Sequence, residues 1–192
     1  YKRQAPSIGL ALLHGVLGQI FLSVMVVIAV VTSRLWMAAP PPETRPYAKD
    51  DRTFQRWLII IMIVQLVLGA AQRHLAALLI VHICLAAVVV LLAVMVGGRA
   101  WGLYRSSQPV EFLGKLMVIL ACVQVFLGIT ALAVTQGRAV VGSPTTLEVT
   151  ITTLHQATGA ALLALSVMLH LWTGRLFRQA DVPTPGQLRV KS

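Results

Sequence analysis

Five long uncharged and mostly apolar stretches make up most of the chain, and short polar segments separate them. No Asp, Glu, Lys or Arg occurs within residues 8–31, 57–72, 74–98, 116–137 and 149–174. A helix that crosses a bilayer needs about 20 residues, and only the stretch at 57–72 falls short of the usual range. Residues 53–55 extend it if the charged head of Arg56 reaches back to the interface. We therefore predict an all-α polytopic membrane protein with five transmembrane helices, four of which form an antiparallel four-helix bundle.

Composition and charge agree with this pattern. Hydrophobic residues make up 57% of the chain and charged residues 11%, whereas soluble proteins carry about 25% charged residues. So few charges cannot cover a water-exposed surface, which excludes a soluble enzyme and makes membrane lipid the expected surroundings. The net charge of +10 does not indicate a nucleic-acid partner, because the bases lie in short segments between apolar stretches, as in cytoplasmic loops.

The distribution of the bases predicts the orientation. One side of the membrane would hold twelve Lys and Arg residues, in the 32–56 connector, the 99–115 loop and the C-terminal tail, and the other side four. The positive-inside rule places the richer side in the cytoplasm. We expect a bacterial-type inner or cytoplasmic membrane, with the N-terminus of this chain outside and its C-terminus cytoplasmic. An outer N-terminus suggests an odd number of upstream helices, although processing explains the initial Tyr1 equally well.

These expectations divide the chain into four parts. Residues 1–31 form an outer N-terminus and the first helix, and residues 32–56 a Pro-rich cytoplasmic connector. Residues 57–174 form the four-helix bundle, and residues 175–192 a cytoplasmic tail. The segment 38–46 cannot be helical, because its prolines lack the backbone N–H that a helix uses.

The apolar stretches contain no carboxylate, but they contain histidines, which can ligate a metal or a cofactor. His14, His82 and His155 are the seventh, ninth and seventh residues of their stretches, counted from the outer end. At about 1.5 Å per residue, all three lie roughly 9–13 Å below the outer helix ends. Two imidazoles facing each other across a bundle can ligate one haem iron, whereas zinc sites use three or four protein ligands. His82 and His155 are therefore candidate haem-iron ligands, and the alternative is that each histidine bonds a neighbouring helix or water.

Short motifs repeat around these histidines. The first stretch reads LHGVLGQ from residue 13, and the last reads LHQATGA from residue 154. QLVLG begins at Gln65 and QVFLG at Gln124, which places Gly69 and Gly128 close to the histidine level. Glycine there allows close approach of a planar ligand or of a second backbone, and ordinary small-residue helix packing is the alternative.

The succession LHGVLGQ, QLVLGAAQRH, IVHICLA, QVFLG and TLHQATGA resembles the haem A synthase family. That family has eight transmembrane helices in two pseudo-symmetric halves, each with a haem-ligating histidine pair on its second and fourth helices. Residues 8–31 look like the family's fourth helix, and the remaining four helices look like its complete second half. The resemblance therefore implies three further helices upstream.

The resemblance also implies residue roles. His82 and His155 match the histidine pair of the second half and would ligate haem b. His14 matches the last histidine of the first half, and its partner would lie upstream of Tyr1. Arg73 matches a basic position suited to haem propionates, since an arginine fork suits a carboxylate, and interfacial anchoring is its alternative role. His170 is expected near the opposite interface, as a surface histidine.

Three functions follow from these observations. The first is a haem A synthase-like oxidoreductase of cytochrome oxidase biogenesis, which oxidises the methyl group of haem O towards haem A. The family's reaction centre includes an intramembrane glutamate that this chain lacks, so no catalytic residue is assigned. The second is a non-catalytic, electron-transferring haem-b subunit of a respiratory or photosynthetic membrane complex, and the third is a haem-free packing subunit. The expected partners are an upstream half, a second copy or a larger membrane complex.

Overall fold

Helices account for nearly all of the regular structure in the computed structural model, which describes residues 8–75, 78–136 and 144–179. The elements are, in chain order, α1 (Ile8–Val31), α2 (Arg34–Met37), β1 (Glu43–Arg45), α3 (Ala48–Leu75), α4 (Leu79–Leu103), α5 (Gln108–Gln136), α6 (Thr146–Leu176) and β2 (Phe177–Gln179). Five of these helices, α1 and α3 to α6, are long and apolar enough to cross a membrane. The prediction of an all-α chain with five candidate spans is confirmed, and the fold is that of a multi-pass membrane protein.

Several predicted helix boundaries are wrong, above all those of α3 and the start of α4. α3 begins at Ala48, well before Trp57, because its charged first turns are also helical, with Asp50 and Asp51 favourably placed at the positive end of the helix dipole. It continues to Leu75, so residue 74 belongs to this helix and does not begin the next one. α4 begins only at Leu79, after Leu78 adopts a left-handed backbone with φ of 69°. No charged residue stands at this position in the sequence, so the charge pattern could not predict where α4 begins.

The connector and the tail are more structured than predicted. Residues 32–56 contain α2, β1 and the start of α3. β1 pairs in parallel with β2, with Glu43 opposite Phe177. Arg175, expected in a free tail, belongs to α6 and donates hydrogen bonds to the carbonyl oxygens of Ala39 at 3.0 Å and Pro40 at 3.3 Å. These contacts tie the connector to the end of α6, while the rest of the predicted tail, from residue 180, lies outside the described residues.

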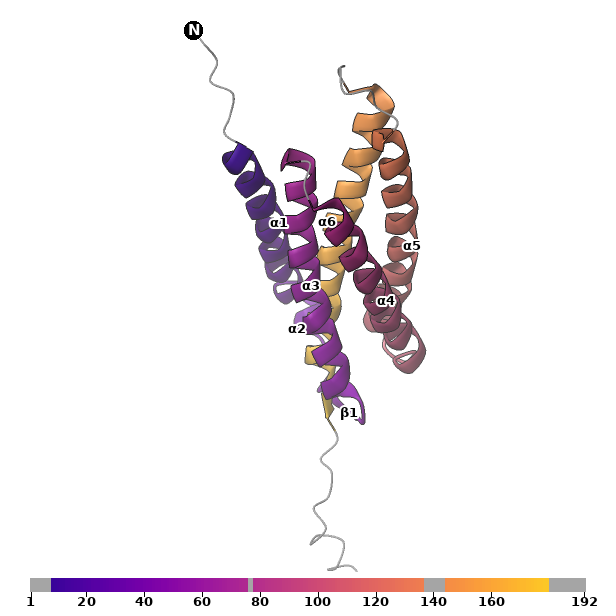
Figure 1. Ribbon diagram of the computed structural model, residues 1–192. Coiled ribbons are helices and arrows are strands. Elements are labelled where there is room, and N and C mark those ends of the chain that lie inside the picture. The colour runs from indigo at the N-terminus through magenta and orange to yellow at the C-terminus, as the bar shows by residue number, and fades with distance from the viewer. Residues whose placement is uncertain (1–7, 76–77, 137–143, 180–192) are drawn as a thin grey trace, which may run out of the picture.

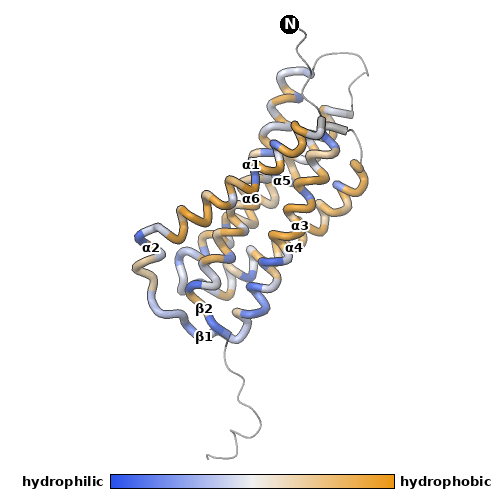
Figure 2. Tube along the Cα trace, turned by 90° about the vertical axis from the view of Figure 1, so that its left-hand side faces the viewer, coloured by the Kyte–Doolittle hydropathy of each residue, from blue (hydrophilic) through white to orange (hydrophobic). Residues whose placement is uncertain are grey.

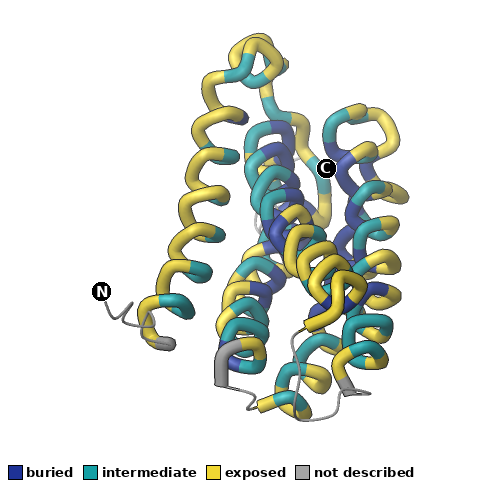
Figure 3. Tube along the Cα trace, turned by 90° about the horizontal axis from the view of Figure 1, so that it is seen from above, coloured by how far each residue is buried: buried dark blue, intermediate teal, exposed yellow. Residues whose placement is uncertain are grey.

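The long helices lie side by side, and successive ones run in opposite directions (Figure 1). α3 packs on α4, α4 on α5, α5 on α6, and α6 on α3, while α1 packs on α3 and α6. α4 and α6 therefore face each other from opposite sides of α3 and α5. The helix that follows the N label in Figure 3 is mostly exposed, and in Figure 2 the polar residues gather at the end with α2, β1 and β2.

The buried core occupies the half of the molecule nearer the strands. Its largest fully buried hydrophobic side chains are those of Leu58, Met117, Leu162 and Leu169. α4 and α5 approach closely, since a Cβ on Gly114 would lie 2.7 Å from the carbonyl oxygen of Gly97. The packing of this half holds the helices together and fixes their arrangement in the other half.

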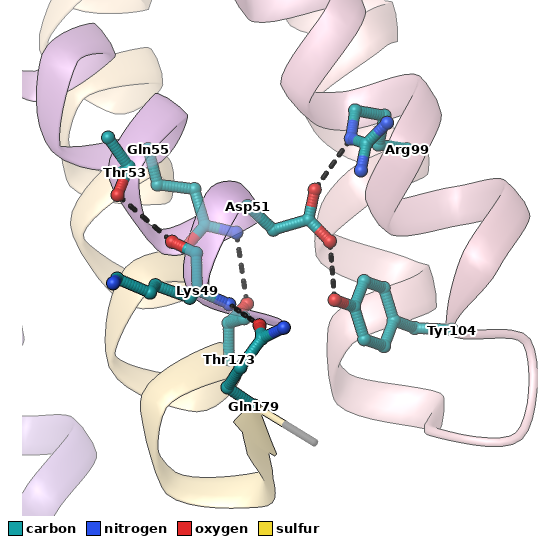
Figure 4. Close-up of polar contacts among 8 residues, drawn as sticks. All are labelled: Lys49, Asp51, Thr53, Gln55, Arg99, Tyr104, Thr173 and Gln179. Atoms are coloured by element: carbon teal, nitrogen blue, oxygen red, sulfur yellow. Dashed lines mark hydrogen bonds and ion pairs between the residues drawn. The ribbon is translucent and has the colours of Figure 1, made fainter. Parts of the chain in front are cut away.

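A polar cluster links the helices at the strand end of the core (Figure 4). The buried carboxylate of Asp51 accepts a hydrogen bond from Arg99 Nε at 2.6 Å and another from the Tyr104 hydroxyl. Gln55 Nε2 donates to Thr173 Oγ1 at 3.0 Å and joins α3 to α6. Burial, together with the hydrogen bond to Asp51, raises the pKa of the Tyr104 hydroxyl. Because the Asp51 charge has two donors, it is compensated within the cluster.

Candidate functional site

His82 on α4 lies against a glutamine and a glycine of α3. The Gln65 side-chain amide donates from Nε2 to the His82 carbonyl oxygen at 2.9 Å and lies 3.0 Å from Nδ1 of the imidazole. One turn further along α3, a Cβ on Gly69 would lie 3.1 Å from Cε1 of the same ring. The glutamine therefore binds the histidine backbone, and the glycine makes room for its ring.

His155 on α6 lies in the same setting against α5. Gln124 Nε2 donates to the His155 carbonyl oxygen at 3.1 Å, and Oε1 of the same side chain accepts a hydrogen bond from the Thr158 hydroxyl. A Cβ on Gly128 would lie 3.1 Å from Cε1 of the His155 ring. The QxxLG repeat in the sequence is thus a repeated contact in three dimensions: glutamine to the histidine carbonyl, and glycine to the imidazole.

The repeat explains both glycines. Residues four apart lie on one face of a helix, so Gln65 and Gly69 meet α4 together, as Gln124 and Gly128 meet α6. The sequence left two roles open for these glycines, ligand approach and helix packing. The contacts indicate a more specific role than either. Each glycine accommodates the imidazole of the next helix.

The two histidines belong to helices that face each other across α3 and α5. Both side chains are half-buried. Within the described residues, the Nδ1 atom of His155 is buried without a hydrogen-bond partner, and so is Oε1 of Gln65. No group of three or more His, Cys, Asp or Glu side chains gathers there as a metal site. The arrangement offers two nitrogen ligands, which is the number that a haem iron takes from a protein on its two faces.

Arg73 lies beside this pair, near the end of α3. Its side chain is exposed and donates from Nη1 to the side-chain oxygen of Gln156, the residue that follows His155. The structure therefore brings Arg73 next to the His155 segment, as a propionate-binding role requires. The guanidinium has further N–H donors beyond the one that it uses here.

His14 is not brought to this site. Its side chain is exposed on α1, and it makes no side-chain hydrogen bond to another described residue. A Cβ on Gly15 or Gly18 would meet nothing within 4 Å. This face of α1 is open, so the expectation of a partner for His14 outside this chain stays a prediction.

The main cluster of buried hydrophobic residues ends before the histidine level on all four helices. Its last member on α3 is Met62 and its last on α5 is Ala121, one turn or less before Gln65 and Gln124. On α4 and α6 the core begins at residues 89 and 162, about two turns after each histidine. The two Gln–Gly–His units therefore lie beyond this cluster, where Ala71 and Leu127 are buried outside it.

The histidines and glycines of this site could be identified from the sequence, whereas no role was predicted for the glutamines. The signal was present, since both glutamines open the QxxLG repeat, but the sequence does not show which helix a side chain will meet. Comparison of the chain with protein-family models, curated proteins and solved structures finds no match.

Proposed function

We propose that the chain is an integral membrane haem-b-binding protein in which His82 and His155 are the two axial ligands. One observation carries the proposal. Two histidines on facing helices are each held by the same glutamine and glycine contact, at the level where the hydrophobic core ends. A histidine that only bonds a neighbouring helix needs no matching partner. Two histidines with the same set of contacts are therefore better explained by a shared ligand.

The side chains present fit a haem. A neutral imidazole ligates metal through one nitrogen, while the other is oriented by a second group. The Gln65 amide lies beside Nδ1 of His82, and its Oε1 has no partner in the described part of the chain. Ligation through Nε2 would leave a proton on Nδ1, so Gln65 would turn its Oε1 to the ring to accept that N–H and would give up its hydrogen bond to the His82 carbonyl oxygen. The unpartnered Nδ1 of His155 also leaves that ring free to bind a ligand.

Bound between these residues, a haem b would supply one-electron transfer. The chain would hold it by two imidazoles and bind a propionate through Arg73, whose guanidinium suits a carboxylate. The apolar helices would keep bulk water from the iron. The resemblance to haem A synthase extends the proposal to a part in haem O oxidation, with the upstream half supplying the missing glutamate, and a non-catalytic haem-b subunit of a larger complex is the alternative.

Absorbance of the purified protein tests the ligand pair. The parent should show a low-spin spectrum with a sharp reduced α band. His82→Ala and His155→Ala should each lose that spectrum and retain less haem, because either change opens a coordination position. His170→Ala is the matched control, because His170 lies at the other end of α6 and should leave the spectrum unchanged. Parental low-spin spectra and haem content in both alanine variants would reject the assignment.

The two haem functions are separated by their products. Membranes containing the protein are incubated with haem O, and the haems are extracted and separated by chromatography. A synthase-like activity converts haem O to a more oxidised haem, and that conversion should disappear in His155→Ala. An accessory subunit keeps its haem b and leaves haem O unchanged.

A further inference from the structure

The end of the helices opposite the histidine pair contains a strongly basic pocket. Its volume is about 290 Å³, and it is lined by Lys49, Arg52, Arg56, His170 and Gln179. The three bases come from successive turns of α3, the histidine from α6 and the glutamine from β2. The lining contains no acidic side chain.

The charges in this pocket are not compensated by the described residues. None of its three bases belongs to an ion pair among those residues. The nearby carboxylate of Asp51 is bound by Arg99 and Tyr104 on α4. Arg52 reaches across to α6, where a Cβ on Gly174 would lie 3.7 Å from its Cδ. The three positive charges therefore lie close together on α3, beside α6.

Hydrogen bonds fix the position of Gln179 at the edge of the pocket. The Gln179 side chain accepts a hydrogen bond from the backbone N–H of Lys49 at 3.1 Å and donates one to the Pro46 carbonyl oxygen at 2.6 Å. Figure 4 shows Lys49 and Gln179 next to the Gln55–Thr173 pair that joins α3 to α6. Within the described residues, the buried Nδ1 atom of His170 has no hydrogen-bond partner. The site thus combines clustered charge, a shaped cavity and an unused polar atom.

The pocket lies at the level of a membrane interface. Arg56 directly precedes the uncharged stretch of α3, and Trp57, at the start of that stretch, is 55% exposed. Tryptophan concentrates where hydrocarbon gives way to lipid headgroups. Arginine and lysine side chains in pockets between transmembrane helices bind phosphate headgroups through charge-assisted hydrogen bonds. We propose that this pocket binds the phosphate group of an anionic phospholipid.

Native mass spectrometry of the delipidated full-length chain in neutral detergent tests the site. Phosphatidylglycerol is added, and bound lipid is counted for the parent and for the double variant Arg52→Gln/Arg56→Gln. The control is Arg105→Gln/Arg178→Gln, which removes two exposed bases from the same end outside the pocket. The pocket variant should bind roughly tenfold or more weakly, while the control should stay within about twofold of the parent. Equal loss in both variants, or no loss in either, overturns the proposal.

Two further ligands separate the possible sources of phosphate. Phosphatidylcholine should bind more weakly than phosphatidylglycerol and should not depend on Arg52 and Arg56. Inorganic phosphate at millimolar concentration should not displace phosphatidylglycerol, and displacement would assign the pocket to free phosphate instead of lipid. Far-UV circular dichroism reports whether the double variant folds. If it does not, Lys49→Gln, whose side chain is exposed, replaces it, and unchanged lipid binding in that variant counts against the site.

Discussion

At the scale of single residues, the most specific finding is that each candidate haem ligand is seated on a glycine. Gly69 and Gly128 were predicted from the QxxLG repeat as positions of close approach, and the structure identifies what approaches them as the imidazoles of His82 and His155. The sequence could not identify the neighbour, because residues on different helices meet only through the packing. The same limitation explains why Gln65 and Gln124 were given no role.

Larger side chains at these glycines should displace the histidines. In Gly69→Leu and Gly128→Leu, the added Cβ starts 3.1 Å from the ring carbon and the rest of the side chain requires space that the ring occupies. We expect loss of the low-spin haem spectrum in each variant, measured by absorbance at matched protein concentration. Gly98→Leu on α4 is the control, because a Cβ there meets nothing within 4 Å. A parental spectrum in both site variants would show that the glycines do not position the ligands.

Tyr104 provides a prediction about pH. Burial and the hydrogen bond to Asp51 raise the pKa of its hydroxyl, so the folded protein holds this proton more tightly than the unfolded chain does. The resulting stabilisation is complete below the unfolded pKa of about 10 and is lost as the pH rises towards the folded value. The melting temperature in detergent should therefore fall more steeply with pH above about pH 10 in the parent than in Tyr104→Phe. Tyr47→Phe, at a tyrosine that is 54% exposed, should keep the parental slope.

At the scale of elements, the number of spans could be predicted from the sequence, but their ends could not. Only the end of the first uncharged stretch, at residue 31, coincides with a helix end, that of α1, where Thr32 and Ser33 follow. α3 instead runs on through its charged beginning, and the break before α4 falls at Leu78, inside an apolar stretch. An uncharged stretch predicts which residues of a helix lie in lipid. The ends of the helix depend instead on backbone conformation and on capping contacts.

The contact between α4 and α5 depends on a pair of glycines. A Cβ on Gly114 would lie 2.6 Å from the backbone nitrogen of Trp101 and 2.7 Å from the carbonyl oxygen of Gly97. Backbone atoms cannot rotate away, so Gly114→Ala must separate the two helices. We expect a loss of about 1–3 kcal/mol in the free energy of unfolding, measured by thermal or denaturant unfolding in detergent. Gly102→Ala, where a Cβ meets nothing within 4 Å, should be neutral or slightly stabilising, and equal effects of the two changes would contradict the packing argument.

At the scale of the whole molecule, the two ends of the helices differ in chemistry. One end holds the histidine pair, and the other holds the strands, the polar cluster and the basic pocket. The sequence predicted that the bases would concentrate at one end, but it could not predict the pocket. Residues 43–45 and 177–179 are distant in the sequence, and only the pairing of β1 with β2 and the return of α6 beside α3 bring Lys49 and Gln179 together.

The final prediction is the orientation of this asymmetric molecule in the membrane. In a Cys84→Ser/Cys122→Ser background, single cysteines are placed at the exposed residues Pro41, at the strand end, and Pro144, just before α6. Among the described residues, ten bases at the strand end against one at the other predict that the strand end is cytoplasmic. A membrane-impermeant maleimide applied to intact cells should therefore label Pro144→Cys and spare Pro41→Cys, and permeabilised cells should label both. The reverse pattern would invert this orientation. The basic pocket would then lie at the outer leaflet and the histidine pair nearer the cytoplasmic side, so haem would have to enter from the cytoplasm.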